Sequence, residues 1–300
     1  MGACRYRVLH STLYVYSDTV SSSYGRAYLT PREFPGQRLL DHEVHIDPVP
    51  SDRSVGMDVY GNTTLYFHVT AEHLRLEVTG ESVVEVEPAP LPDTSPPWEK
   101  ARPAMAFDKN GPLAVEFALD LNPPEIIPEV AAYAAESFPP GRPVLEAVAE
   151  LTTRIYTDFT YKSGSTTVST RVADVFKART GVCQDFARLG LACLRSQGLA
   201  ARYVSGYLAT TPPPGKKRLV GADATHAWAA VWLPGGSGGD RWIDFDPTNN
   251  KFADERYVTL AWGRDYADVP PLRGIIYTDA KKSTITVSVD VAPLEDDPNA

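Results

Sequence analysis

The sequence has few cysteines, no long apolar run and no excess of positive charge, and each of these deficits excludes a class of protein. Three cysteines among 300 residues, with no C-x-x-C pair, are too few for a disulfide framework, a zinc ribbon or a dithiol redox site. No segment reaches the roughly 18 consecutive apolar residues of a membrane-spanning helix. The net charge of −9 argues against nucleic acid or an anionic membrane surface as a partner.

The beginning of the chain also lacks the features of a secretory signal. The segment MGACRYRVLH carries charge at Arg5 and has no apolar core. We therefore expect a cytoplasmic protein, whose three cysteines are free thiols in that reducing compartment.

The chain divides into a β-rich first part, a proline-rich connection and a mixed second part. Residues 1–90 contain short runs rich in Val, Tyr, Thr and Leu, cut by turn signals, which predict an antiparallel β-sandwich-like domain. Residues 91–145 are a proline-rich linker followed by a helical connection, with six prolines between positions 87 and 104. Residues 146–295 combine helical segments with strand-like runs, and we assign the C-terminal strands to this domain. Helices followed by antiparallel strands predict an α+β fold.

Cys183 lies at the start of a predicted helix, two residues after Gly181. Backbone N–H groups and the helix dipole at such a position stabilise a thiolate, which is the reactive form of cysteine. Asp185 is interpreted as a charge that stabilises the helix start. Cys193 lies in the middle of the same helix and is predicted to be a small core residue. Taken alone, Cys183 is more simply explained as a buried helix-start residue, so the case for a nucleophile depends on its partners.

The distribution of histidines leaves one candidate base. Five of the six histidines lie in the predicted N-terminal β domain, and His226 is the only one after residue 73. If a histidine of its own domain activates Cys183, that histidine is His226. A lone histidine in a strand is more often structural, so the neighbouring carboxylates matter.

An aspartate can reach His226 across a predicted hairpin. The strands HAWAAVWL and RWIDFD are joined by the glycine-rich loop PGGSGGD. A hairpin centred on Gly236 places Asp246 directly opposite His226, at the roughly 4.5–5.5 Å Cβ separation of cross-strand neighbours. A hairpin centred on Gly235 places Asp244 there instead, and the spacing alone allows either aspartate. Asp246 also fits an Asx turn, because Asp-Pro-Thr-Asn-Asn is rich in turn formers. A nucleophile, a base and an orienting carboxylate in this arrangement are typical of Cys-His-Asp acyl transfer.

With these residues in place, the chain resembles the transglutaminase-like superfamily, a group with the papain-like fold that includes bacterial cysteine peptidases. The matching runs are GVCQDFA (181–187), LRSQGLAARYVSGY (194–207), THAW (225–228), WIDFDPTNN (242–250) and AWGRDY (261–266). The combination is specific although no single run is, and with the β-rich first part it covers nearly the whole chain of a two-domain bacterial member. The resemblance implies Cys183, His226 and Asp246, the aspartate before Pro-Thr, as catalytic residues, and with them a hairpin centred on Gly236. Arg188 departs from the pattern, since many relatives carry histidine there.

The expected reaction is cysteine-dependent acyl transfer on an amide or peptide substrate, through a thioester on Cys183. Water as the acceptor gives a peptidase or amidase and an amine gives protein-glutamine transamidation, and the residues do not distinguish the two. The backbone N–H of Cys183 is the first expected donor to the oxyanion, with Tyr161 and Gln184 as candidate donors beside it. Trp228 and Trp242 are candidates for lining the substrate channel, although strand aromatics are as often core residues.

Two other classes of function compete with this one. A non-catalytic transglutaminase-fold binding or scaffold module keeps the fold without the chemistry, and selective thiol labelling of Cys183 over Cys193 separates it from an enzyme. A zinc hydrolase fits poorly, because one cysteine, one histidine and aspartates form a poor zinc ligand set. We expect no cofactor and no metal, and a peptide, protein or amide as substrate, with an amine acceptor in the case of transamidation. Nothing in the sequence indicates the oligomeric state.

Overall fold

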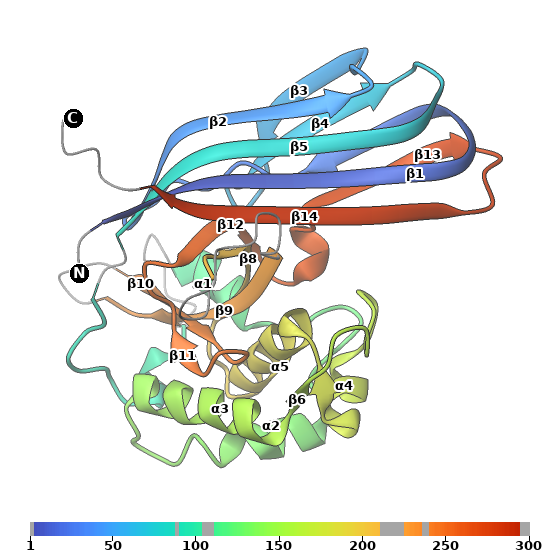
Figure 1. Cartoon of the computed structure of the whole chain (residues 1–300). Helices are drawn as coiled ribbons and strands as arrows, with labels where there is room; N and C mark the ends of the chain where they lie inside the picture. The colour runs from blue at the N-terminus through green and yellow to red at the C-terminus, as the bar shows by residue number, and fades with distance from the viewer. Residues whose placement is uncertain (1–2, 88–89, 104–110, 211–224, 236–239, 295–300) are drawn as a thin grey trace, which may run out of the picture.

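The protein is built in three layers (Figure 1). The computed structural model describes residues 3–87, 90–103, 111–210, 225–235 and 240–294, and every structural statement below concerns these residues. A curled antiparallel sheet forms one outer layer, a five-stranded sheet lies in the middle, and most of the helices cover the far side. An antiparallel β domain joined to a mixed second part confirms the predicted α+β fold class.

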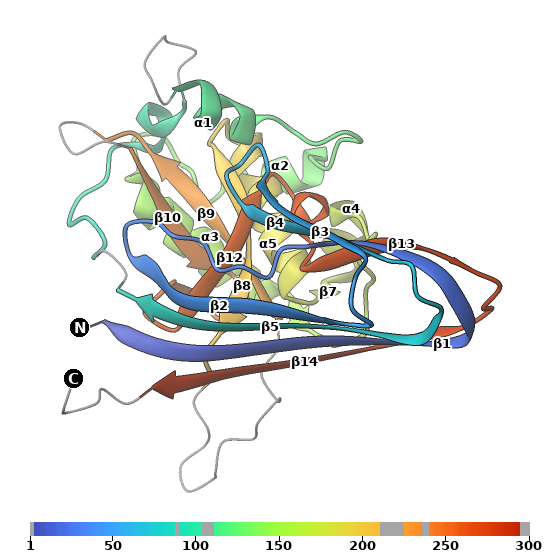
Figure 2. The same cartoon turned by 90° about the horizontal axis from the view of Figure 1, so that it is seen from above.

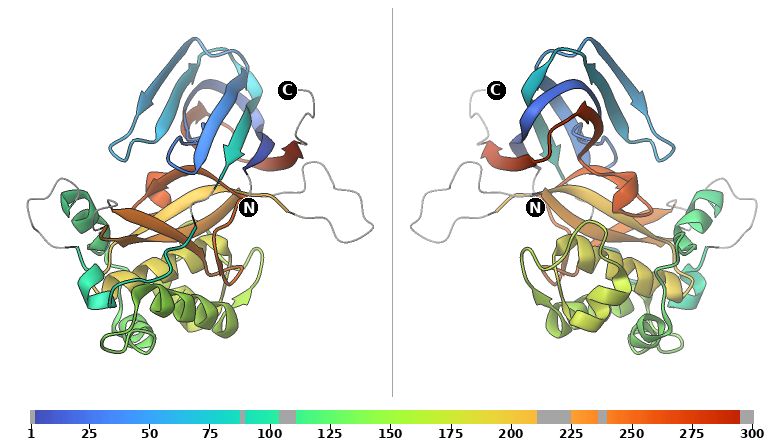
Figure 3. Two further views of the ribbon diagram at one scale, coloured as in Figure 1. Left: turned by 90° about the vertical axis from the view of Figure 1, so that its left-hand side faces the viewer. Right: turned by 90° about the vertical axis from the view of Figure 1, so that its right-hand side faces the viewer.

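The first sheet is organised around one long strand, β1. The N-terminal strands of this sheet are β1 (Cys4–Ala27), β2 (Gln37–Asp47), β3 (Asp52–Met57), β4 (Thr63–Val69) and β5 (His73–Val86). They lie in the order β2-β5-β1-β4-β3, with β5 along the first half of β1 and β4 along its second half. Buried and exposed residues alternate along β5, because only one face of the sheet covers the core. The sheet curls strongly, as the end-on views show (Figure 3).

The last two strands of the chain belong to this first sheet. Both β13 (Leu272–Thr278) and β14 (Ser283–Leu294) pair antiparallel with β1, and β14 places Leu294 opposite Arg5. Seen from above, β1, β5 and β14 run side by side along the length of the sheet (Figure 2). We expected these strands in the second domain, because alternation reveals a strand but not its pairing partner. The domain boundaries themselves stay a prediction.

The second domain packs helices against one face of the five-stranded sheet. Its helices are η1 (Trp98–Ala101), α1 (Gly111–Ala118), α2 (Pro128–Ala135), α3 (Val144–Asp158), α4 (Val172–Ala178), α5 (Cys183–Ser196) and η2 (Tyr266–Asp268). The sheet has the order β11-β10-β9-β8-β12 and consists of β8 (Ala201–Leu208), β9 (Thr225–Leu233), β10 (Arg241–Asp246), β11 (Lys251–Phe252) and β12 (Tyr257–Gly263). Two short parallel strands, β6 (Thr160–Tyr161) and β7 (Thr180–Gly181), lie beside the start of α5.

Helix α5 is the centre of this domain. It contacts β8 and β9 on one side and α2, α3 and α4 on the other. Leu189, Leu191 and Leu194 are buried in one cluster with Ala229 and Val231 of β9. The charged residues among the buried positions of α5, which are Asp185, Arg188 and Arg195, are hydrogen-bonded to neighbouring segments.

Within the ranges given above, no helix combines the length and the apolar character needed to cross a bilayer.

Candidate active site

Cys183 is the first residue of α5, at the point where the chain leaves an extended conformation. Val182 before it has φ −119° and ψ −179°, and its backbone N–H donates a hydrogen bond of 2.8 Å to the Asp185 carboxylate. Asp185 therefore holds the start of the helix. The Cys183 side chain is half-buried, whereas Cys193 is fully buried and burial raises the pKa of its thiol to about 12. The two cysteines of α5 thus differ as their positions predict.

His226, the second residue of β9, bridges Cys183 and Asp246. Its Nε2–H donates a hydrogen bond of 2.7 Å to Asp246 Oδ2, and the ring lines the same cavity as Cys183. Burial alone would lower the pKa of His226, but its interactions with Asp246 and Cys183 raise it to about 10. A protonated imidazole beside a cysteine is an arrangement that stabilises a thiolate, the form in which cysteine attacks a carbonyl.

Asp246 is the fully buried last residue of β10, and both of its carboxylate oxygens have hydrogen-bond donors. Besides His226, Oδ2 accepts hydrogen bonds from Asn249 Nδ2 at 2.6 Å and from the Tyr257 hydroxyl at 2.8 Å. The other oxygen, Oδ1, accepts the backbone N–H groups of Thr248 and Asn249 at 2.8 and 3.3 Å. Burial alone would raise the pKa of Asp246, but its side-chain hydrogen bonds and the charge of His226 hold it below its usual range. One oxygen forms the Asx turn and the other holds the imidazole, so both interpretations of this aspartate apply.

The predicted hairpin register is wrong by two residues. Asp244 lies opposite Ala230 and Trp242 opposite Trp232, so His226 and Asp246 are diagonal neighbours rather than a directly opposed pair. A shift of two residues keeps every side chain on its original face, and the long imidazole spans the diagonal. Asp244, the alternative aspartate, instead accepts a hydrogen bond of 3.0 Å from Trp228 Nε1.

Asn249 and Tyr257 were not among the site residues predicted from the sequence. Asn249 was visible only as a turn former in the run after β10. Tyr257 begins β12, which is not adjacent to β10 in the sheet, so no local pattern connects it with Asp246.

Cys183 and His226 face a cavity of about 360 Å³, which we call the Cys183 cavity. Tyr161 and Gln184 line it as well, and β6 places Tyr161 next to Gly181. Burial, followed by the negative charge of Cys183, raises the pKa of Tyr161. Both candidate oxyanion donors therefore line the same cavity as Cys183, although Gln184 Nε2 also donates a hydrogen bond of 3.4 Å to the Val168 carbonyl.

Trp228 and Trp242 do not line the Cys183 cavity. Trp228 is fully buried behind His226, with the two rings stacked at 6.0 Å. Trp242 lines a different cavity on the sheet. Trp228 and Trp242 were expected to line the substrate channel, but neither of them lines the Cys183 cavity.

The first sheet supplies one wall of the Cys183 cavity. His10, Thr12 and Tyr14 of β1 and Ile285 and Val287 of β14 line it. His10 is buried, its Nδ1 is 2.9 Å from the Tyr207 hydroxyl, and burial lowers its pKa to about 4, so it is neutral at physiological pH. His10 was not predicted as a site residue, because nothing in the sequence indicates that β1 would border the Cys183 cavity.

Arg188, the position that departs from the family pattern, forms hydrogen bonds with three neighbouring segments. Its Nε and Nη2 donate hydrogen bonds of 2.8 and 3.1 Å to the Asp265 carboxylate. Its Nη1 donates to the Thr170 carbonyl at 2.6 Å, and Nη2 approaches Glu125. These contacts tie the segment before α4 and the segment after β12 to α5.

Comparison with known proteins identifies the family. The family model of the bacterial transglutaminase-like N-terminal region matches residues 6–85, and that of the transglutaminase-like superfamily matches residues 131–247. The uncharacterized protein Rv2569c of Mycobacterium tuberculosis is 59% identical over 99% of this chain and 95% of its own length. The uncharacterized protein ML0607 of Mycobacterium leprae is 33% identical over 97% of this chain and 99% of its own length.

One solved structure shares the fold over the whole chain. It is a protein from Cytophaga hutchinsonii, provisionally named a cysteine protease, with a TM-score of 0.75 and 21% identity over 99% of this chain and 93% of that one. At this identity the likeness concerns the fold alone. The family matches and the close relatives together show that the chain belongs to the transglutaminase-like superfamily.

Proposed function

We propose that the protein is a cysteine-dependent acyl-transfer enzyme acting on an amide or peptide bond through a thioester on Cys183. The observation that carries this proposal is the position of His226, which lines one cavity with Cys183 and donates a hydrogen bond to Asp246. This is the arrangement of nucleophile, base and orienting acid that acyl transfer requires.

In the first half of the reaction, the Cys183 thiolate attacks the substrate carbonyl and forms the C–S bond. The backbone N–H of Cys183 stabilises the oxyanion, with Tyr161 and Gln184 as side-chain candidates beside it. The C–N bond breaks as His226 gives its proton to the leaving amine, and the acyl group remains on sulfur.

In the second half, neutral His226 removes a proton from the acceptor as the acceptor attacks the thioester. Water releases the acid and makes the enzyme a peptidase or amidase, whereas a primary amine forms a new amide. In both cases the proton returns to His226 and the thiolate is restored. Asp246 holds the imidazole in one orientation and stabilises its charge throughout.

Selective alkylation tests the activated nucleophile first. Iodoacetamide near neutral pH should label Cys183 at least tenfold faster than Cys4, which is also half-buried and is the internal control, and His226→Ala should remove most of the difference. Equal, slow labelling of both thiols contradicts the proposal and favours a non-catalytic binding or scaffold module that keeps the fold.

Acyl-transfer activity needs a separate measurement. Fluorogenic peptide amides and glutamine-containing peptides, each with and without a primary amine, should be turned over by the native chain and not by Cys183→Ala. Product masses then distinguish hydrolysis from transamidation. A cytoplasmic location remains part of this proposal, and fractionation of cells that produce the protein tests it.

A further inference from the structure

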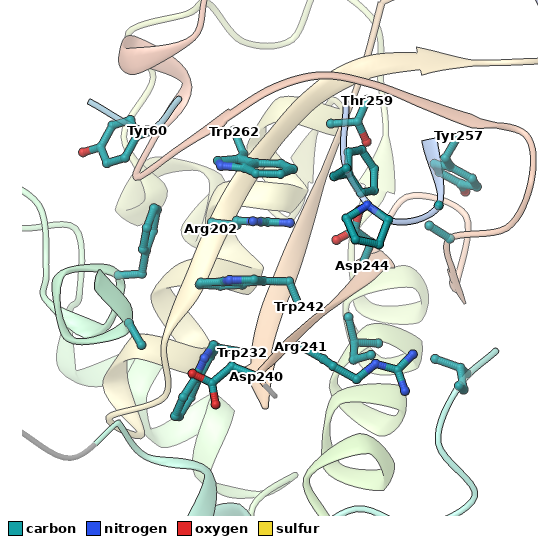
Figure 4. A pocket seen from close by; sticks show the side chains of 18 of the residues that line it. Tyr60, Arg202, Trp232, Asp240, Arg241, Trp242, Asp244, Tyr257, Thr259 and Trp262 are labelled. Atoms are coloured by element: carbon teal, nitrogen blue, oxygen red, sulfur yellow. The ribbon is translucent and has the colours of Figure 1, made fainter. Parts of the chain in front are cut away.

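A second and larger cavity lies on the face of the five-stranded sheet that is directed away from α5. Its volume is about 590 Å³, and β8, β9, β10 and β12 form its floor (Figure 4). Loop residues of the first sheet and helix α1 form its sides. We call this cavity the aromatic pocket. Five aromatic residues and one arginine define it: Tyr60, Phe117, Arg202, Trp232, Trp242 and Trp262. Neither Cys183 nor His226 lines it, so it is distinct from the Cys183 cavity.

Arg202 lies between two indole rings in this pocket. Its guanidinium carbon is 4.5 Å from the centre of the Trp242 ring and 3.6 Å from that of Trp262. Figure 4 shows the three side chains stacked one above the other. On the other side of Trp262, Arg32 lies 3.6 Å from the ring centre. The stack fixes the plane of the Arg202 guanidinium, so only its edge is left to meet another group.

The edge of this guanidinium has no hydrogen-bond acceptor among the described residues. Arg202 is only 7% exposed, and its Nε is buried without a partner. The nearby Asp244 carboxylate favours the charged form of Arg202, but it accepts its hydrogen bond from Trp228 and not from Arg202. Burial lowers the pKa of Arg202 to about 9, against the effect of Asp244, so the side chain is charged at neutral pH. A buried cation without acceptors is unfavourable, because it has lost its hydration without gaining hydrogen bonds, and cation–π stacking offsets only part of this cost.

The other charged groups that line the pocket are already engaged. Arg241 Nη2 donates to the Pro90 carbonyl at 3.0 Å. Asp254 is paired with Arg256 at 2.8 Å, and Asp240 accepts a hydrogen bond from a backbone N–H. Of the two arginines that line the pocket, Arg202 is therefore the one whose N–H groups are left to bind an anion.

We propose that the aromatic pocket binds a small molecule with an apolar body and one carboxylate group, and that Arg202 is the partner of that carboxylate. Sites for small molecules typically have volumes of about 300–1,000 Å³, apolar walls and a few polar groups, which describes this pocket. A carboxylate supplies the paired acceptors that a guanidinium fork binds most strongly. The inference concerns binding and does not depend on the chemistry of Cys183.

Isothermal titration calorimetry on the full chain, with three ligands that share one ring system, tests the proposal. We expect 2-naphthoate to bind with one-to-one stoichiometry, at least tenfold more tightly than the neutral 2-naphthamide or the cationic 2-naphthylmethylamine. Arg202→Met should remove the preference for the carboxylate. This variant should fold, because an apolar side chain of similar length fills the space between the indoles, and replacing a buried charge in this way is often neutral or stabilising. Arg202→Lys keeps the charge without the fork and should retain part of the preference.

Arg241→Met is the matched control, because it removes the other lining guanidinium, and it should change the naphthoate affinity by less than about twofold. The proposal is overturned if no saturable binding is seen up to millimolar concentration, or if the amide or the amine binds as tightly as the carboxylate. It is also overturned if Arg241→Met, rather than Arg202→Met, removes the preference. The comparison of the three ligands on the native chain decides the question even if Arg202→Met fails to fold.

Discussion

The Tyr257 hydroxyl donates a hydrogen bond of 2.8 Å to Asp246 Oδ2, the same oxygen that holds His226. The Tyr257 ring also lines the aromatic pocket on the opposite face of the sheet from α5. One side chain thus connects the orienting carboxylate of the candidate active site with the second cavity. It also helps to hold the pKa of Asp246 below its usual range, against the effect of burial.

Tyr257→Phe should destabilise the protein by about 1–2 kcal/mol at pH 7, since a hydrogen bond to a buried charged acceptor is lost. The folded-state pKa of Asp246 is depressed, so the stability from this carboxylate is present above its unfolded value and is lost as the pH falls through the folded value. Urea unfolding should therefore show a full difference between variant and native protein at pH 7 and a smaller one near pH 3. Tyr156→Phe, at an exposed tyrosine, is the control. A difference that grows on acidification contradicts this account.

The two aspartates of β10 should differ sharply when each is changed to asparagine. Asp246→Asn removes the negative charge that stabilises protonated His226 and allows an amide NH2 to face Nε2, which favours the wrong tautomer, so turnover should fall on the order of 100-fold or more. Asp244→Asn keeps an oxygen for the Trp228 indole, so turnover should change by less than about threefold. Steady-state rates with a peptide amide measure both variants. Equal losses would assign no special role to Asp246.

Local patterns predicted much of the candidate site. Cys183 at a helix start and a single histidine in the second domain nominated two of the residues that the structure brings together. Alternation on two strands left Asp244 and Asp246 as alternatives, and the family resemblance selected Asp246. These features depend on a few neighbouring positions each, and the sequence displays them directly. Cys193 was separated from Cys183 by the same reasoning, and its burial confirms it.

Features that depend on how distant segments meet were not predictable. The length of the loop between β9 and β10 permits more than one register, and only packing selects the observed one. The pairing of β13 and β14 with β1 joins the two ends of the chain, and this pairing brings Ile285 and His10 to the wall of the Cys183 cavity. The contact between Tyr257 and Asp246 is non-local in the same way.

The alkaline side of the pH profile should depend on the leaving group. The pKa of His226 is raised to about 10, so above that pH the imidazole has no proton to give to a leaving amine. Turnover of a p-nitroanilide should fall as the pH rises through about 10. A p-nitrophenyl ester of the same acyl group leaves without protonation, and its acylation rate should not fall there. If both substrates lose rate together, the loss reports unfolding rather than the proton of His226.

The apolar side chains of β14 beside Cys183 should select the substrate. Ile285 and Val287 line the Cys183 cavity yet are 57% and 49% exposed, so a substrate side chain that covers them gains roughly 25 cal/mol per Å² of apolar area removed from water. Ile285→Lys and Val287→Lys should therefore slow labelling of Cys183 by a leucine acyloxymethyl ketone probe about fivefold or more. Labelling by iodoacetamide, which is too small to reach this wall, should not change. Ile275→Lys is the matched control, because Ile275 is an exposed apolar residue of β13 in the same sheet that does not line the cavity. If the control variant loses probe labelling, or if the two β14 variants keep it, these side chains do not contribute to substrate selection.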